Sequence, residues 1–142
     1  MAMRTRVLIL CTANSARSQM AEGLLRHEGG DRFDVASAGT QPSRVRPEAI
    51  AVMRELGMDI SGQRSKSVEE FIGQDFDYVI TVCDTAKQSC PVFPGKTTLM
   101  HWSIEDPAAA EGDEDARLAV FRRVRDELRQ RLRGFILEHA PS

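Results

Sequence analysis

Three cysteines, one arginine and a short polar segment are the residues of this chain whose types and spacing could do chemistry. Cys11 opens the segment, and Arg17, followed by Ser18, lies six residues after it. The residues between Cys11 and Arg17 are Thr12, Ala13, Asn14, Ser15 and Ala16. A tight loop of this length can turn successive backbone N–H groups inward and form a concave anion site. The segment therefore predicts an oxyanion-binding loop with a cysteine at its base.

Cys11 is the candidate nucleophile of this loop, because the thiolate of a cysteine is the reactive form. A free cysteine is only about 3% ionised at pH 7. The loop N–H groups, the positive end of a following helix, Arg17 and the Ser18 hydroxyl are each expected to lower the pKa of Cys11. The arginine can also bind two oxygens of a phosphate-like ligand. A merely structural, buried Cys11 would leave Asn14, Arg17 and Ser18 unexplained.

Alternating apolar segments indicate which elements position the loop. Residues 7–10, 33–36, 78–82 and 97–100 read as strands, and helical spacing of apolar residues runs through 20–29, 47–57 and 118–136. This order predicts an α/β fold, a single domain spanning 1–142 with a four-stranded, mostly parallel sheet flanked by helices. Ligands bind beyond the carboxyl ends of such strands, where both Cys11 and Cys83 lie. The stretch 57–75 is either a lid or a surface connection.

Composition narrows the class of protein. The chain has 142 residues, 42% hydrophobic and 28% charged, with a net charge of −2, so we expect no nucleic-acid or membrane partner. The arginines between 122 and 133 alternate with acidic residues and predict a solvated helix face. Only four aliphatic residues follow the first arginines, too few for a secretory signal or a membrane span. We therefore expect a cytoplasmic protein, in which a disulfide is more often catalytic than structural.

The pattern Cys-x5-Arg-Ser after a first strand resembles the signature of the low-molecular-weight protein tyrosine phosphatase fold. Within that fold the chain is similar to the thioredoxin-coupled arsenate reductases from its first strand to its final helix. The strings that carry the resemblance are CTANSARSQMAEG (11–23), SAG (37–39), DIS (59–61), VITVCD (79–84), SCPVFPG (89–95), HWSIEDP (101–107) and FRRVRDEL (121–128). The resemblance implies the strand order 2-1-3-4, which periodicity alone leaves open.

The resemblance also implies roles for single residues. Cys11 would attack arsenate, Arg17 would bind the oxyanion and Ser18 would stabilise the thiolate, while Asn14 shapes the loop. Asp106, which precedes a proline, would be the general acid that protonates the departing hydroxide. The phosphatases carry a tyrosine after their Asp-Pro pair, where this chain has Ala108. This departure favours arsenate over an aromatic phosphate ester as the substrate.

Reduction, unlike hydrolysis, explains three cysteines. In the implied relay Cys83 attacks Cys11 and releases arsenite, and Cys90 then attacks Cys83 to leave a disulfide that thioredoxin reduces. Seven residues of continuous helix rise about 10.5 Å, whereas the Cα atoms of a disulfide lie within about 7 Å. The segment from Cys83 to Cys90 must therefore loop or unwind. We expect no bound cofactor, thioredoxin as the source of electrons, and a monomer.

Some arsenate reductases of this type hold a potassium ion near the loop. Asn14, Glu22 and Ser37 fit that site, but Lys66 stands where a carboxylate is expected, so we predict no metal site and no potassium dependence. The cysteines and a nearby histidine fit no common zinc spacing.

Two other functions stay open at this point. A phosphatase would use Cys11, Arg17 and Asp106 alone, and a weak phosphatase side activity is compatible with the reductase. A non-enzymatic redox or metalloid sensor would use the thiols without needing Arg17.

Overall fold

A four-stranded sheet forms the centre of the protein. The computed structural model describes residues 4–83, 93 and 95–140, so the predicted site residue Cys90 lies outside the described residues. The strands are β1 (Thr5–Cys11), β2 (Phe33–Gly39), β3 (Tyr78–Thr81) and β4 (Thr98–His101). Their order is β2-β1-β3-β4, and all three pairings are parallel. The predicted α/β sheet and the strand order implied by the resemblance are both confirmed.

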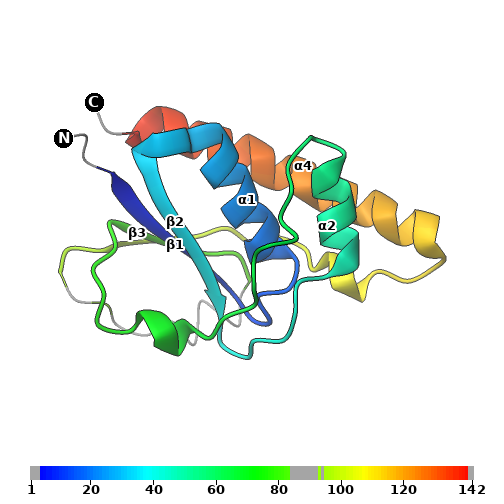
Figure 1. Cartoon of the computed structure of the whole chain (residues 1–142), viewed down its shortest axis with the longest axis horizontal. Helices are drawn as coiled ribbons and strands as arrows, with labels where there is room; N and C mark the ends of the chain where they lie inside the picture. The colour runs from blue at the N-terminus through cyan, green and yellow to red at the C-terminus, as the bar shows by residue number, and fades with distance from the viewer. Residues whose placement is uncertain (1–3, 84–92, 94, 141–142) are drawn as a thin grey trace.

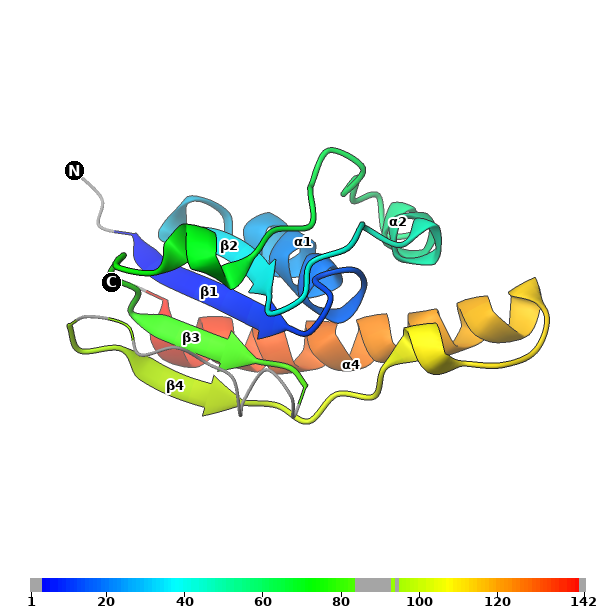
Figure 2. The same ribbon diagram turned by 90° about the horizontal axis from the view of Figure 1, so that it is seen from below.

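Three helices accompany the sheet in the described part of the chain. They are α1 (Arg17–Gly29), α2 (Pro47–Arg54) and α4 (Glu114–His139). Helices α1 and α4 cover the same face of the sheet, and α2 lies beside the first half of α4 (Figures 1 and 2). Among the residues that the structure describes, none of the helices is both long and apolar enough to cross a membrane.

The burial of each element explains its type. The run Val7-Leu8-Ile9-Leu10 of β1 has no exposed surface, as expected for a central parallel strand that is covered on both faces. Helix α4 begins four residues before its predicted start, because the side chain of Asp113 accepts a hydrogen bond from the N–H of Ala116 at 2.8 Å and caps the first turn. Its buried residues repeat at helical spacing and are Phe121, Val124, Arg125, Leu128, Leu132, Phe135 and Ile136.

Several arginines of α4 are ion-paired with other elements instead of lying only on a solvated face, so this expectation is partly wrong. Arg125 is buried, and one of its guanidinium nitrogens lies 2.8 Å from the carboxylate of Glu55. Arg129 and Arg133 both bind Glu28 of α1, at 2.5 and 3.0 Å. These charges therefore tie α4 to its neighbours, a role that local alternation of charge does not reveal.

The stretch 57–75 supports the anion loop. It passes over α1 and contains the short 3₁₀ helix Val68–Phe71. Just before that helix the backbone meets the end of β2, where the N–H of Gly39 donates to the carbonyl of Lys66 at 2.8 Å. Gly39 also forms a parallel bridge with Ser67. This stretch therefore braces the back of the segment that follows β1.

Candidate active site

The predicted oxyanion loop lies at the carboxyl end of the sheet. Cys11 is the last residue of β1, and α1 begins at Arg17. Cys83 follows the neighbouring strand β3 by two residues, so both cysteines lie at the same edge of the sheet. A cavity of about 380 Å³ opens there, and it is lined by Cys11, Thr12, Ala13, Ser15, Ala16, Arg17, Cys83 and Asp106. The structure thus brings together every described residue that was predicted to be catalytic.

Three carbonyl oxygens of the loop point outward, toward residues 40–46. The N–H groups of Gln41, Ser43 and Arg46 donate to the carbonyls of Thr12, Ala13 and Ser15 at 2.8, 3.1 and 2.8 Å. The N–H of Thr12 donates on the other side of the loop, to the sulfur of Cys11. This is the polarity that a loop needs in order to bind an anion.

Helix α1 adds its positive end to the loop. Its N-cap residue is Ala16, which offers no side-chain hydrogen bond, and its first turn carries no acidic residue. The first N–H groups of the helix are therefore not occupied by a cap of its own and can serve an anion. Arg17 is nearly buried at 12% side-chain exposure, and its Nη1 donates to the carbonyl of Ile104 at 3.0 Å, which holds the guanidinium at the cavity.

Asn14 braces the loop from behind and is fully buried. It adopts a left-handed backbone conformation with φ of 49°, which asparagine tolerates better than most residues. Its Nδ2 donates to the hydroxyls of Ser18 and Ser37 at 2.7 and 3.0 Å. Its Oδ1 accepts from the backbone N–H of Lys66 at 2.9 Å. These bonds are consistent with the loop-shaping role that the resemblance implies.

Asp106 reaches the cavity from a distant part of the chain. Its Oδ2 lies 3.8 Å from Nη2 of Arg17, and its Oδ1 accepts from the N–H of Ala108 at 3.0 Å. The side chain is about half exposed, so it can exchange protons with solvent while it borders the cavity. This placement suits a general acid for a leaving group that departs toward the cavity mouth.

The second thiol changes the electrostatics of the first. The hydrogen bond with Cys83 raises the pKa of Cys11 and burial raises it further, whereas Arg17 and the N–H of Thr12 lower it. Arg17 and the loop N–H thus lower the pKa of Cys11 as expected, but Cys83 and burial outweigh them and the net pKa is raised. The residue types of the loop and of the helix give no sign of a neighbouring thiol, and two such thiols resist carrying two negative charges. Neither cysteine is in a disulfide.

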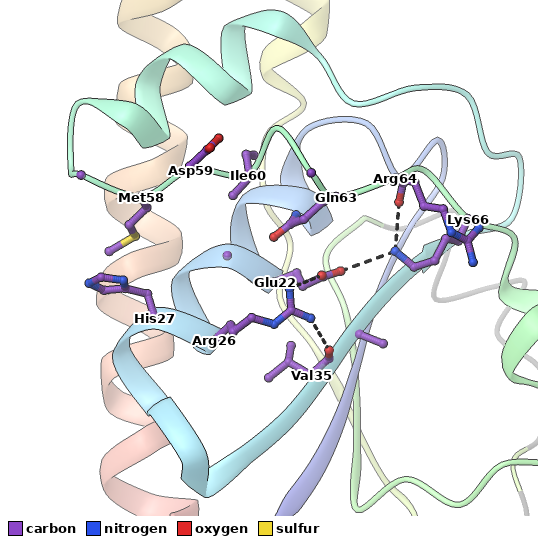
Figure 3. A pocket seen from close by; sticks show the side chains of 14 residues that line it. Glu22, Arg26, His27, Val35, Met58, Asp59, Ile60, Gln63, Arg64 and Lys66 are labelled. Atoms are coloured by element: carbon purple, nitrogen blue, oxygen red, sulfur yellow. Dashed lines mark hydrogen bonds and ion pairs between the residues drawn. The ribbon is translucent and has the colours of Figure 1, made fainter.

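Glu22, one of the side chains that fit a potassium site, has the lysine Lys66 beside it (Figure 3). The hydroxyl of Ser37 donates to Oε1 of the buried Glu22 at 2.6 Å, and Nζ of Lys66 lies 3.6 Å from the same oxygen. Arg26 contacts the other oxygen of Glu22 at 2.8 Å, and Nζ of Lys66 also donates to the carbonyl of Arg64 at 2.9 Å. Two cationic side chains already neutralise this carboxylate, so the residues do not fit a bound potassium ion.

Sequence reasoning missed three residues that support the loop. Gly39 has no room for a side chain, because a Cβ there would lie 2.5 Å from the carbonyl oxygen of Thr12. Gln19 is fully buried and binds both the backbone and the side chain of Asn14. Ser65 donates to the carbonyl of Ala13 at 2.9 Å. Only Gly39 carried a local signal, a glycine at the end of a strand next to the loop.

Comparison with known proteins agrees with this geometry. Residues 6–140 match the family described as low molecular weight phosphotyrosine protein phosphatase. An arsenate reductase of Halalkalibacterium halodurans is 45% identical over 129 residues, which cover 91% of this chain and 93% of that protein.

Solved structures show the same relationship. An arsenate reductase in the phosphate-binding state superposes with a TM-score of 0.77 at 38% identity and covers 94% of this chain and 98% of its own. The thioredoxin-dependent arsenate reductase of Corynebacterium glutamicum has a TM-score of 0.69 at 27% identity, covering 96% of this chain and 64% of its own. The chain therefore belongs to the low molecular weight phosphotyrosine protein phosphatase family, among its arsenate reductases.

Proposed function

We propose that this protein reduces arsenate to arsenite, with Cys11 as the nucleophile and thioredoxin as the source of electrons. The observation that carries the proposal is the contact of a second thiol, Cys83, with Cys11 inside the anion-binding cavity. Hydrolysis of an ester would need only one of these thiols, whereas reduction needs two. The names of the relatives, including the thioredoxin-dependent structure, support the same activity.

The first step is the attack of the Cys11 thiolate on arsenic. The N–H groups of the loop, the first turn of α1 and Arg17 hold the oxygens of arsenate. A sulfur–arsenic bond forms while an arsenic–oxygen bond breaks, and Asp106 protonates the departing hydroxide to give water.

The second step transfers two electrons to arsenic. The thiolate of Cys83 attacks the sulfur of Cys11, so a sulfur–sulfur bond forms and the sulfur–arsenic bond breaks. The electron pair of the broken bond stays on arsenic, which leaves as arsenite, and the two thiols are oxidised to the Cys11–Cys83 disulfide. The sulfur of Cys83 lies 3.1 Å from the hydroxyl of Thr12, at the wall of the loop, and this closeness supports the proposed attack.

The third step regenerates the nucleophile. Cys90 attacks Cys83, which releases the Cys11 thiolate and forms a Cys83–Cys90 disulfide, and thioredoxin then reduces this disulfide to two thiols. Because Cys90 lies outside the described residues, its part rests on the sequence and on the resemblance. We further propose that residues 1–142 act as one domain and as a monomer in the cytoplasm.

A phosphatase is the second candidate function, and the family match favours it. Cys11, Arg17 and Asp106 could hydrolyse a phosphate ester without the other thiols. Ala108 stands two residues after Asp106 and offers no ring against which an aromatic ester could stack. We therefore expect at most a weak phosphatase activity.

The decisive measurement is the arsenate-dependent oxidation of NADPH in the presence of thioredoxin and thioredoxin reductase. Hydrolysis of para-nitrophenyl phosphate is followed in parallel. We expect NADPH oxidation to disappear in Cys83→Ser and in Cys90→Ser, while any phosphatase activity survives. Absence of NADPH oxidation in the unmodified enzyme, together with efficient hydrolysis, would establish the phosphatase instead.

Single turnovers test the order of the relay. Cys90→Ser is expected to release one arsenite per enzyme and to accumulate the Cys11–Cys83 disulfide, which peptide mapping identifies by mass. Multiple turnovers by this variant would contradict a three-thiol relay. Arg17→Ala distinguishes an enzyme from a sensor, because a sensor would still oxidise its thiols whereas an enzyme would lose turnover.

A further inference from the structure

Gln19 is a fully buried amide whose two ends are both fixed by hydrogen bonds. Its Nε2 donates to the carbonyl and to Oδ1 of Asn14 at 3.0 and 2.9 Å, and to the carbonyl of Arg64 at 2.9 Å. Three oxygens surround this nitrogen, so an amide turned the other way would place its own oxygen against them. The surroundings therefore determine the orientation of the Gln19 amide.

A second amide supports that orientation from the opposite side. Nε2 of Gln63 donates to Oε1 of Gln19 at 2.8 Å and to the carbonyl of Gln19 at 3.0 Å. Gln63 belongs to the stretch that passes over α1, and Figure 3 shows it above Glu22. The side-chain nitrogen of Gln63 thus donates to the side-chain oxygen of Gln19, and the side-chain nitrogen of Gln19 donates in the same way to Asn14.

The polarity of this series determines what Asn14 does. Oδ1 of Asn14 faces Gln19 and the N–H of Lys66, so Nδ2 must face the hydroxyls of Ser18 and Ser37. The proton of Ser37 is donated to Glu22. Ser18 accepts from Asn14, so its own proton is available to an acceptor other than Asn14. In the proposed chemistry the acceptors that need a donor are the sulfur of Cys11 and the bound oxyanion.

We propose that Gln19, supported by Gln63, is a positioning residue that orients the Asn14 amide so that Ser18 donates its proton into the anion loop. Gln19 does not line the cavity and acts only through Asn14. The catalytic consequence of this orientation rests on the proposed function. The orientation itself does not, because it follows from hydrogen bonds that are present without a substrate.

The substitution Gln19→Glu tests the proposal with a side chain of the same shape. An ionised carboxylate at position 19 cannot donate to Asn14, so Oδ1 of Asn14 would keep only the N–H of Lys66 as a donor and the Asn14 amide would be held less firmly in its orientation. In the part of the molecules where the amide turns, Ser18 would donate to the Asn14 oxygen and no longer into the loop. We expect the pH at which Cys11 is half-ionised to rise by about one unit, and kcat at neutral pH to fall about tenfold with a smaller change in KM.

Ionisation of Cys11 is followed by its alkylation with iodoacetamide across pH, with the modified peptide identified by mass. Gln63→Glu is the second variant, because it removes the donor to Gln19 from a position farther from the loop, and it should shift the profile in the same direction. Gln74→Glu is the matched control: it makes the same chemical change at the half-buried partner of Arg6, away from the loop, and should leave the profile unchanged.

Unchanged alkylation profiles in folded Gln19→Glu and Gln63→Glu, with only a lower melting temperature, would overturn the proposal and leave both residues a purely structural role. Alkylation requires no arsenate. A shifted profile in an enzyme that fails to reduce arsenate would therefore support the positioning role while the proposed function fails. Arg17 and Cys83, the other groups that affect Cys11, are unaltered in every variant.

Discussion

The hydroxyl oxygen of Thr12 lies 3.1 Å from the sulfur of Cys83, which joins the second thiol of the site directly to the anion loop. Cys83 in turn forms a hydrogen bond with Cys11. The reduced enzyme therefore contains a pair of thiols in which ionisation of one opposes ionisation of the other. The second thiol that reduction requires therefore also makes the nucleophile Cys11 harder to ionise.

Removal of Cys83 is predicted to make Cys11 more acidic. The contact with Cys83 is the largest cause of the raised pKa of Cys11, so Cys83→Ala should lower that pKa. Because the thiolate is the form that reacts, alkylation of Cys11 should reach half its maximal rate at a lower pH than in the parent. The measurement uses a Cys90→Ser background in both proteins, so that the third thiol does not compete. A profile that stays in place or moves to higher pH would contradict the assigned cause.

Gly39→Ala is predicted to damage the anion loop. The added Cβ would lie 2.5 Å from the carbonyl oxygen of Thr12 and 2.9 Å from the backbone nitrogen of Asn14. Backbone atoms cannot move aside as a flexible side chain can, so we expect a loss of about 1–3 kcal/mol in the free energy of unfolding. The same distortion moves the loop N–H groups, so the affinity for phosphate, measured by calorimetry, should fall about tenfold or more. A tenfold loss of affinity corresponds to about 1.4 kcal/mol.

Gly62→Ala provides the control for this substitution. A Cβ at Gly62 would meet no atom within 4 Å, so stability and phosphate affinity should be retained. Equal behaviour of the two variants would show that the close approach of Gly39 to the loop has no energetic importance.

Potassium is predicted not to activate the enzyme. The ammonium of Lys66, 3.6 Å from Glu22, supplies the positive charge beside this buried carboxylate. Arsenate reduction should therefore proceed at the same initial rate in potassium chloride and in sodium chloride of equal ionic strength. Lys66→Met removes this charge, and we expect its lower rate to be partly restored by potassium. Clear activation of the unmodified enzyme by potassium would refute the role given to Lys66.

Glu28→Gln is predicted to destabilise the protein in a pH-dependent way. Burial raises the pKa of Glu28, but the hydrogen bonds from Arg129 and Arg133 outweigh it, so the folded-state pKa is lowered. The ion pairs of Glu28 therefore stabilise the protein fully at pH values above about 4.3, the pKa of a glutamate in the unfolded chain. This stabilisation is lost as the pH falls through the lower pKa that Glu28 has in the folded protein. We expect a loss of about 1 kcal/mol at pH 7, measured by urea unfolding, that disappears in acid.

Glu127→Gln is the matched control for this ion pair. Glu127 bonds only to Arg131 on the same helix among the contacts described, and both side chains are over 40% exposed. Its loss should be no more than about 0.5 kcal/mol. A larger effect at Glu127 than at Glu28 would argue against the link between α1 and α4.

The parts of the protein that depend on neighbouring residues were predictable from the sequence. The segment 11–18 is contiguous, so its residue types alone indicate an anion loop with a thiol at its base. The fully apolar run of β1 indicates a central parallel strand for the same local reason. Alternation of strands and helices then predicts the fold class, and it places Cys11 and Cys83 at one edge of the sheet.

Tertiary structure decided the relations that cross the chain. The order β2-β1-β3-β4 makes β1 and β3 neighbours, which brings Cys83 against Cys11 and raises the pKa of Cys11 despite the loop and Arg17. Asp106 is far from Arg17 in the sequence, and only the fold brings their side chains to 3.8 Å from each other. Gln19 shows no local sign of its role, because its partners come from both a loop and a distant stretch. The periodicity of apolar residues indicates which face of an element is buried, but not which other element covers that face. The contacts of Cys83, Asp106 and Gln19 depend on the covering element, so only the tertiary structure decides them.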